Sequence, residues 1–141
     1  MKKNFVFSVE AILICCAVSG AALILWPRLS GPDFARRYMS IKNGRAILLA
    51  LDKYSERHNG EYPVDDAVLG GSDPDGLVRD GCLVKYPRNP FSDPPKPMKK
   101  VLPEFASPGN FSYHRLPDKA NVFELTVWGM EKKLFSKRSE K

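Results

Sequence analysis

Residues 111–128, FSYHRLPDKANVFELTVW, contain two short runs of apolar and β-branched residues on either side of a turn, PDKAN. Three hydrophobic residues of the second run alternate with their neighbours: Phe123, Leu125 and Val127. This period of two is typical of a strand that buries one face. We therefore predict two antiparallel strands, Phe111–Leu116 and Val122–Trp128.

One or two further strands are expected beside this pair. Met98–Leu102 precedes it, and Leu134–Phe135 follows it after a turn over Gly129–Lys133. The predicted sheet is small and antiparallel, with three or four strands.

A helix is predicted upstream of the sheet. From Pro32 onward, hydrophobic residues recur near helical spacing, with charged residues filling the other side. The hydrophobic positions are Phe34, Tyr38, Ile41, Leu48, Leu51 and Tyr54. The helix should end at His58-Asn59-Gly60, where Gly60 can adopt a left-handed conformation. Since an apolar stripe and an apolar sheet face cover each other, we predict an α+β domain with an amphipathic helix packed on the sheet.

The segment between helix and sheet, 64–108, is crowded with Gly, Pro and Asp. It predicts loops with one short helix near Asp65–Leu69. The whole domain is expected over residues 34–135, followed by a basic, solvated tail over 136–141.

The N-terminal stretch Phe5–Trp26 has a single charged residue, Glu10. As a helix it measures about 33 Å, which matches the hydrocarbon thickness of a bilayer. The rival interpretation is a cleaved secretory signal, but the apolar run continues to Leu25 and ends in Trp26, a residue suited to the headgroup level. We predict a short basic leader and a retained transmembrane helix over residues 1–27, followed by a kink or linker over 28–33, where Gly31-Pro32 either breaks a helix or opens a new one.

Three cysteines limit the redox chemistry. Cys15 and Cys16 lie in the apolar stretch, so Cys82 stands alone in the domain and cannot form an internal disulfide there. We expect Cys82 to be a small buried hydrophobe.

The N-terminal residues resemble those of bacterial type IV pilin-like proteins, in particular the pseudopilins of type II secretion. Lys2-Lys3 followed by Phe7-Ser-Val-Glu10-Ala-Ile-Leu13 is similar to that family's short basic leader and Phe-Thr-Leu-Ile-Glu-Leu-Leu start. An acid within an apolar span costs about 2.5–3.5 kcal/mol on insertion scales, so Glu10 indicates a function. In the family, this glutamate meets the free amino terminus of a neighbouring subunit.

The domain carries further motifs in the family's order. The helix end resembles the family's Asn-Gly-x-Tyr-Pro corner, and Leu125–Gly129 resembles its final Leu-Thr-Val-Tyr-Gly strand. Between them lie Tyr86-Pro-Arg-Asn-Pro-Phe91 and Pro108-Gly-Asn-Phe-Ser-Tyr113.

The resemblance implies roles for four N-terminal residues. Val6 would be the first mature residue, Glu10 the subunit-joining acid and Pro27 the family's helix proline, while Phe5 occupies the place of the glycine that the family's peptidase requires. It further implies a non-catalytic subunit of a type II secretion or type IV pilus-type assembly in the bacterial inner membrane, with its domain on the periplasmic side. Its partners would be other pilin-like subunits, the membrane assembly platform and the bilayer. The alternative is a membrane-tethered binding or sensor domain that does not polymerise, which the missing glycine and the Gly31-Pro32 pair favour.

Other functions find little support in the sequence. His58 and His114 have no ligand-spaced neighbours, and Asp73, Asp75 and Asp80 do not follow a calcium-loop spacing. We predict no cofactor and no metal site. No nucleotide-binding or nucleophile motif occurs, so we predict no enzyme. The net charge of +6 is spread without interleaved aromatics, which favours lipid headgroups over nucleic acid as its partner.

Overall fold

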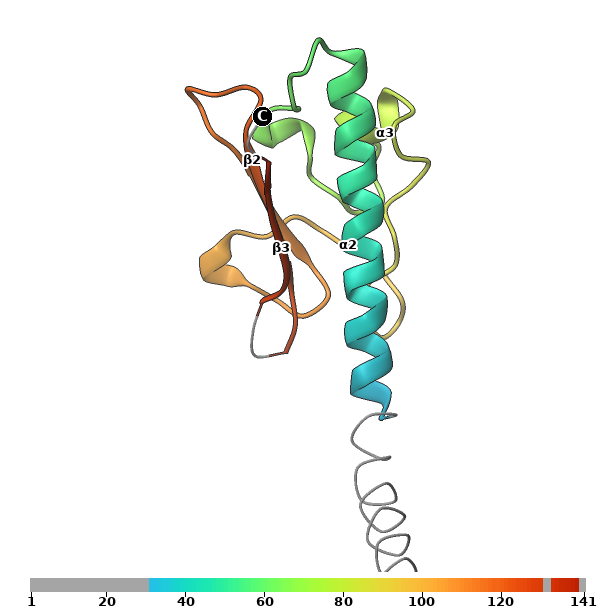
Figure 1. The fold of residues 1–141 in the computed structure, drawn as a ribbon. Helices are drawn as coiled ribbons and strands as arrows, with labels where there is room; N and C mark the ends of the chain where they lie inside the picture. The colour runs from blue at the N-terminus through green and yellow to red at the C-terminus, as the bar shows by residue number, and fades with distance from the viewer. Residues whose placement is uncertain (1–30, 131–132, 140–141) are drawn as a thin grey trace, which may run out of the picture. The chain divides into compact units, whose positions relative to one another are not determined.

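The computed structural model describes residues 31–130 and 133–139 and confirms an α+β fold, in which one long helix packs on a three-stranded antiparallel sheet (Figure 1). The elements are α2 (Pro32–Arg57), η1 (Asp65–Ala67), α3 (Gly76–Arg79), η2 (Pro103–Phe105), β1 (Phe111–Arg115), β2 (Phe123–Trp128) and β3 (Lys133–Ser139). The compact unit that contains the sheet begins at Arg36.

The predicted transmembrane helix Phe5–Trp26 lies outside the described residues. Among residues 31–130 and 133–139, no helix is both long and apolar enough to span a membrane.

Helix α2 begins and ends close to the predicted positions. Pro32 is its first residue, so the second part of the expected linker opens the helix, as a proline in a first turn can. At the other end Asn59 and Gly60 have φ values of 55° and 89°, and the Gly60 N–H donates to the Ser55 carbonyl over 2.8 Å. This left-handed cap turns the chain toward Tyr62.

The buried face of α2 differs from the predicted one. Of the predicted stripe, Leu51 is buried and Ile41, Leu48 and Tyr54 are half-buried, but Phe34 and Tyr38 are exposed. The buried positions are mostly small, namely Ser40, Gly44, Ile47, Ala50, Leu51 and Ser55. Small side chains let the helix backbone approach β2 closely, since a Cβ atom added to Gly44 would lie 2.5 Å from Val127 Cγ2.

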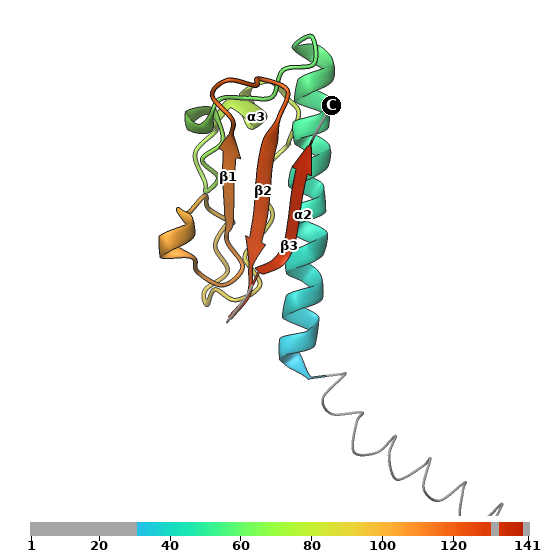
Figure 2. The same ribbon diagram turned by 60° about the vertical axis from the view of Figure 1, so that its left-hand side comes forward.

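The sheet has the order β1-β2-β3 (Figure 2). Phe123, Leu125 and Val127 of β2 are 0% exposed, which confirms the period-two pattern. Strand β3 runs to Ser139, so it includes four residues of the expected basic tail. Met98–Leu102 contributes isolated bridges through Lys99 and Lys100 rather than the expected strand.

Aromatic residues fill the core between helix, corner and sheet. The Tyr62 ring meets the Phe123 ring edge-on with 4.4 Å between centroids, and the Tyr113 hydroxyl donates to the Pro63 carbonyl over 2.7 Å. Cys82 is buried, as predicted. The Tyr62-Pro63 corner thus fixes the end of α2 against the first two strands.

Candidate functional site

The four residues with predicted roles in assembly and processing, Phe5, Val6, Glu10 and Pro27, lie outside the described residues. Three regions of the described part of the chain present side chains to the surface: the loop region 65–97, the outward side of α2 and the outer face of the sheet.

Asp75 organises the loop region. Its carboxylate caps α3 by accepting from Val78 N–H over 3.3 Å, and it also accepts from Leu69 N–H over 2.8 Å and Gly70 N–H over 3.1 Å. The Tyr86 hydroxyl donates to the same carboxylate over 2.6 Å. Burial, followed by this hydrogen bond, raises the pKa of Tyr86 far above its ordinary value. The Asp75 carboxylate therefore has a structural role: it holds the loop in place.

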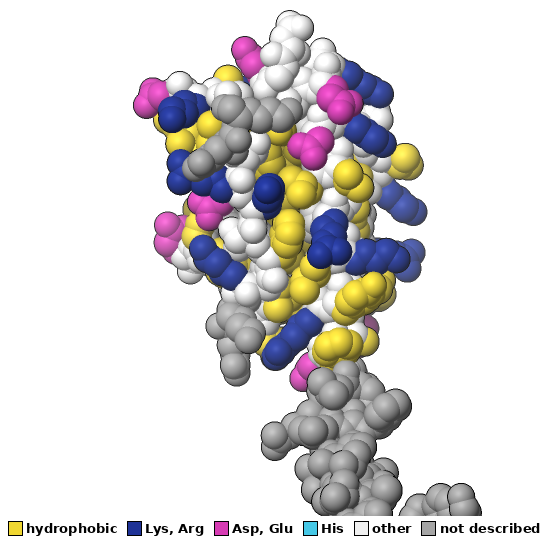
Figure 3. Space-filling view, viewed as in Figure 1, with side chains coloured by type: hydrophobic (Ala, Val, Ile, Leu, Met, Phe, Trp, Pro, Cys, Tyr) yellow, Lys and Arg dark blue, Asp and Glu magenta, His cyan; other side chains and the backbone are white. Residues whose placement is uncertain are grey.

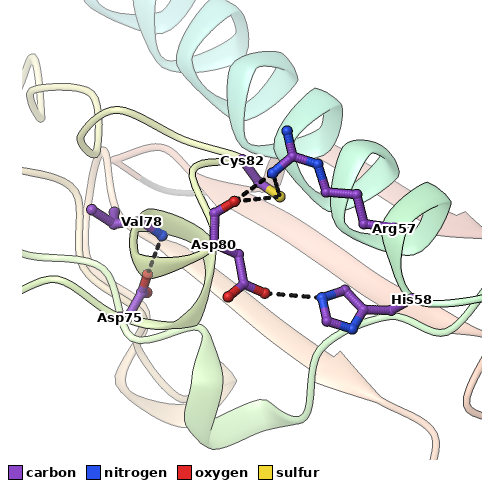
Figure 4. A network of polar contacts seen from close by, with 6 residues as sticks. All are labelled: Arg57, His58, Asp75, Val78, Asp80 and Cys82. Carbon is purple, nitrogen blue, oxygen red and sulfur yellow. Dashed lines mark hydrogen bonds and ion pairs between the residues drawn. The ribbon is translucent and has the colours of Figure 1, made fainter.

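A second network ties this region to the end of α2 (Figure 4). His58 Nε2 lies 2.9 Å from Asp80 Oδ2, and the Arg57 guanidinium donates to the Asp80 carbonyl and lies 3.9 Å from Cys82 Sγ. The His58 ring also stacks on Tyr54, with 3.9 Å between centroids. These contacts fix the position of the loop by joining side chains of two segments far apart in sequence.

The three aspartates of the loop region, Asp73, Asp75 and Asp80, have separate surroundings in the structure. Asp75 is saturated by hydrogen bonds, Asp80 pairs with His58, and Asp73 is exposed. His114 pairs instead with Asp65, 2.7 Å from Nδ1 to Oδ2. Within residues 31–130 and 133–139, no group of three or more His, Cys, Asp or Glu residues is placed to hold a metal ion.

Helix α2 carries large exposed hydrophobic side chains among its Lys and Arg residues (Figure 3). Tyr38 is 61% exposed and Leu49 is 63% exposed. They are about three helical turns apart and so share one side of the helix, which we call the outward side of α2. Lys42 and Arg45 lie between them in the sequence and are also exposed. A helix that buries small residues and exposes large apolar ones leaves hydrophobic area in contact with water, and such area marks sites of protein contact.

The outer face of the sheet, away from α2, carries a groove of about 310 Å³. Alternate residues of β1 and β2 line it, and a wall comes from the segment 100–103. Trp128 Nε1 donates to Ser112 Oγ over 3.2 Å, which holds the indole against the sheet. Sequence reasoning missed this groove. The available signal was the outward set of the period-two pattern: Ser112, His114, Glu124, Thr126 and Trp128.

Comparisons of the sequence with protein-family models and curated proteins, and of the fold with solved structures, gave no match.

Proposed function

We propose that this chain is a non-catalytic pilin-like or pseudopilin-like subunit of a type II secretion or type IV pilus-type assembly. It is anchored in the bacterial inner membrane by Phe5–Trp26 and carries its helix-on-sheet domain on the periplasmic side. Glu10 joins it to a neighbouring subunit, and the outward side of α2 extends that contact beyond the membrane.

The observation that carries this proposal is the exposure of Tyr38 and Leu49 on α2. Their side chains lie on the helix that follows the predicted anchor in the sequence, while the sheet covers the face with Gly44 and Ile47. Hydrophobic residues left on a helix surface favour contact with a protein partner. A neighbouring subunit that bears the same kind of helix supplies such a partner.

A second line of support is the agreement between the motif order and the fold. The Asn59-Gly60 corner ends the long helix. Leu125–Trp128 of the second motif lie in β2, although β3 follows it, so this motif is not in the last strand of the described sheet. A helix that ends in a corner before an antiparallel sheet is what the resemblance to pilin-like proteins implies.

The proposal can be tested by photocrosslinking of the full chain in its native membrane. A photoreactive phenylalanine analogue at Tyr38 should give adducts with another pilin-like subunit or with a second copy. Glu10→Ala should abolish these adducts, because it removes the acid that aligns neighbouring anchors.

The matched control is the same probe at Val84, which is 92% exposed in the loop region. This position should give few or no subunit adducts. Adducts at Tyr38 that persist in the Glu10→Ala chain, or a Tyr38 probe that reacts only with lipid, would contradict the proposal.

The second candidate is the non-polymerising tethered domain, which Phe5 favours because it stands where the family's peptidase needs glycine. For this candidate, Glu10→Ala would leave the behaviour of the chain unchanged or improve its insertion slightly. The same experiment therefore separates the two candidates.

A further inference from the structure

The groove on the outer face of the sheet lies next to a projecting hydrophobic turn. Phe105, in η2, is 73% exposed, and Leu102 just before it is 59% exposed. Figure 2 shows this turn, in orange, standing out beside β1. Leu102 and Pro103 also line the groove, so the projection and the hollow belong to one continuous surface.

The groove has room for an aromatic side chain. Its volume is about 310 Å³, whereas a cavity of about 150 Å³ is enough to hold benzene. The half-buried Trp128 offers an aromatic wall, and Val101 and Leu102 offer aliphatic ones. Phe105 does not fill the groove of its own chain: its side chain is 73% exposed and does not line the groove.

The charges around the projection and the hollow are complementary. Glu104 precedes Phe105 in the turn and is exposed. Lys133 lies at the groove, where its Nζ is 5.7 Å from the centre of the Trp128 ring. Its Nζ lies 4.0 Å from Glu124 Oε1, a long ion pair, and the Lys133 side chain is 57% exposed. An incoming acid can therefore pair with Lys133 as a phenyl ring enters beside it.

We propose that two copies of this chain form a symmetric dimer through this surface, each inserting Phe105 into the groove of the other, with Glu104 facing the partner's Lys133. A projection and a matching hollow side by side on one surface make that surface self-complementary, which is the requirement of a two-fold interface. The contact uses the side of the sheet away from α2. It is thus independent of the proposed joining through Glu10 and the outward side of α2.

The test is the dissociation constant of the dimer, measured by sedimentation equilibrium of the full chain in detergent. Phe105→Ser should raise this constant by about thirtyfold or more, because each dimer loses two buried aromatic anchors. Phe105 is exposed in the single chain, so the substitution leaves its fold intact, which circular dichroism can verify.

The matched control is Val84→Ser, which removes a still more exposed apolar residue from the loop region and lies on neither of the proposed contact surfaces. It should leave the dimer unchanged. Repeating the series in the Glu10→Ala chain separates this dimer from the proposed anchor-mediated assembly, because only the latter depends on Glu10.

Charge reversal gives a second, independent test. Glu104→Lys should weaken the dimer by about tenfold, and adding Lys133→Glu should restore most of the affinity. A chain that stays monomeric at every concentration, an unchanged dimer in Phe105→Ser, or a double variant weaker than Glu104→Lys alone would overturn the proposal.

Discussion

Gly44→Ala is the substitution that most sharply tests the close approach of α2 to the sheet. The new Cβ would lie 2.5 Å from Val127 Cγ2 and 3.5 Å from Phe135 Cδ1. Ordinary carbon contacts are about 3.5–4.0 Å, so Val127 or the helix must move. Val127 is fully buried in the central strand and its β-branched side chain has little rotamer freedom, so it cannot move easily.

Two effects of opposite sign decide the result. Alanine in a helix interior is about 1 kcal/mol more favourable than glycine. Overfilling a well-packed core costs about 1–3 kcal/mol, and a contact this short beside a stiff residue places the cost near the upper end of that range. We expect Gly44→Ala to lower the free energy of unfolding by about 1–2 kcal/mol.

A double-mutant cycle assigns this loss to the contact itself. Val127→Ala alone should cost about 1.5–3 kcal/mol through lost burial. In the double variant, the methyl group at position 44 takes the vacated space. The combined loss should therefore be smaller than the sum of the two single losses by at least about 1 kcal/mol.

The measurement is urea denaturation of the full chain in mild detergent, followed by near-ultraviolet circular dichroism. Lys42→Ala, at an exposed position of the same helix, is the control and should change stability by less than about 0.5 kcal/mol. If Gly44→Ala instead stabilises the chain by about 1 kcal/mol, helix propensity alone would explain it. The close approach of α2 to β2 would then be refuted.

Three further predictions concern the loops and the buried tyrosines. Asp75→Ala should destabilise the domain by about 3 kcal/mol and speed proteolysis within 65–97, because it leaves several loop donors unpaired. Gly109→Ala should cost at least about 2 kcal/mol in urea denaturation, since its φ is +73° and the added Cβ would collide with Asn89 Oδ1. Burial raises the pKa of Tyr86 and of Tyr113, so the folded state holds these protons more tightly than the unfolded state. Stability should therefore be complete below pH 10.0, the ordinary value, and fall above it, with their phenolate absorbance appearing only as the domain unfolds.

The sequence alone predicts the buried face of β2 and the end of α2, because both depend on local patterns. The alternation in β2 predicts its buried face because a strand reverses its side chains at every residue. The end of α2 could be placed because glycine at position 60 adopts φ of 89° without strain.

The sequence misleads about the buried side of α2. The hydrophobic pattern includes the large Tyr38, which is exposed. The helix instead buries Ser40 and Gly44, and Gly44 lies against Val127 of β2. Small residues add little to an apolar pattern, but they decide how closely a helix can approach.

Strand β3 and the groove depend on tertiary context. Lys137 and Arg138 indicate a solvated tail, although charged residues are also typical of an edge strand such as β3. The outer groove needs the segment with Leu102 and Pro103 to lie beside β1, and no local pattern predicts that placement.

The most direct test of the assembly account is the intact mass and N-terminal sequence of the protein purified from its native membrane. The account predicts a chain that begins at Val6, with Phe5 tolerated in the glycine position, so that its free amine can meet Glu10 of a neighbouring subunit. A methylated amine there would be the processing mark expected of a pilin-like subunit. A chain that still begins at Met1 would leave Glu10 without that partner and would contradict the account.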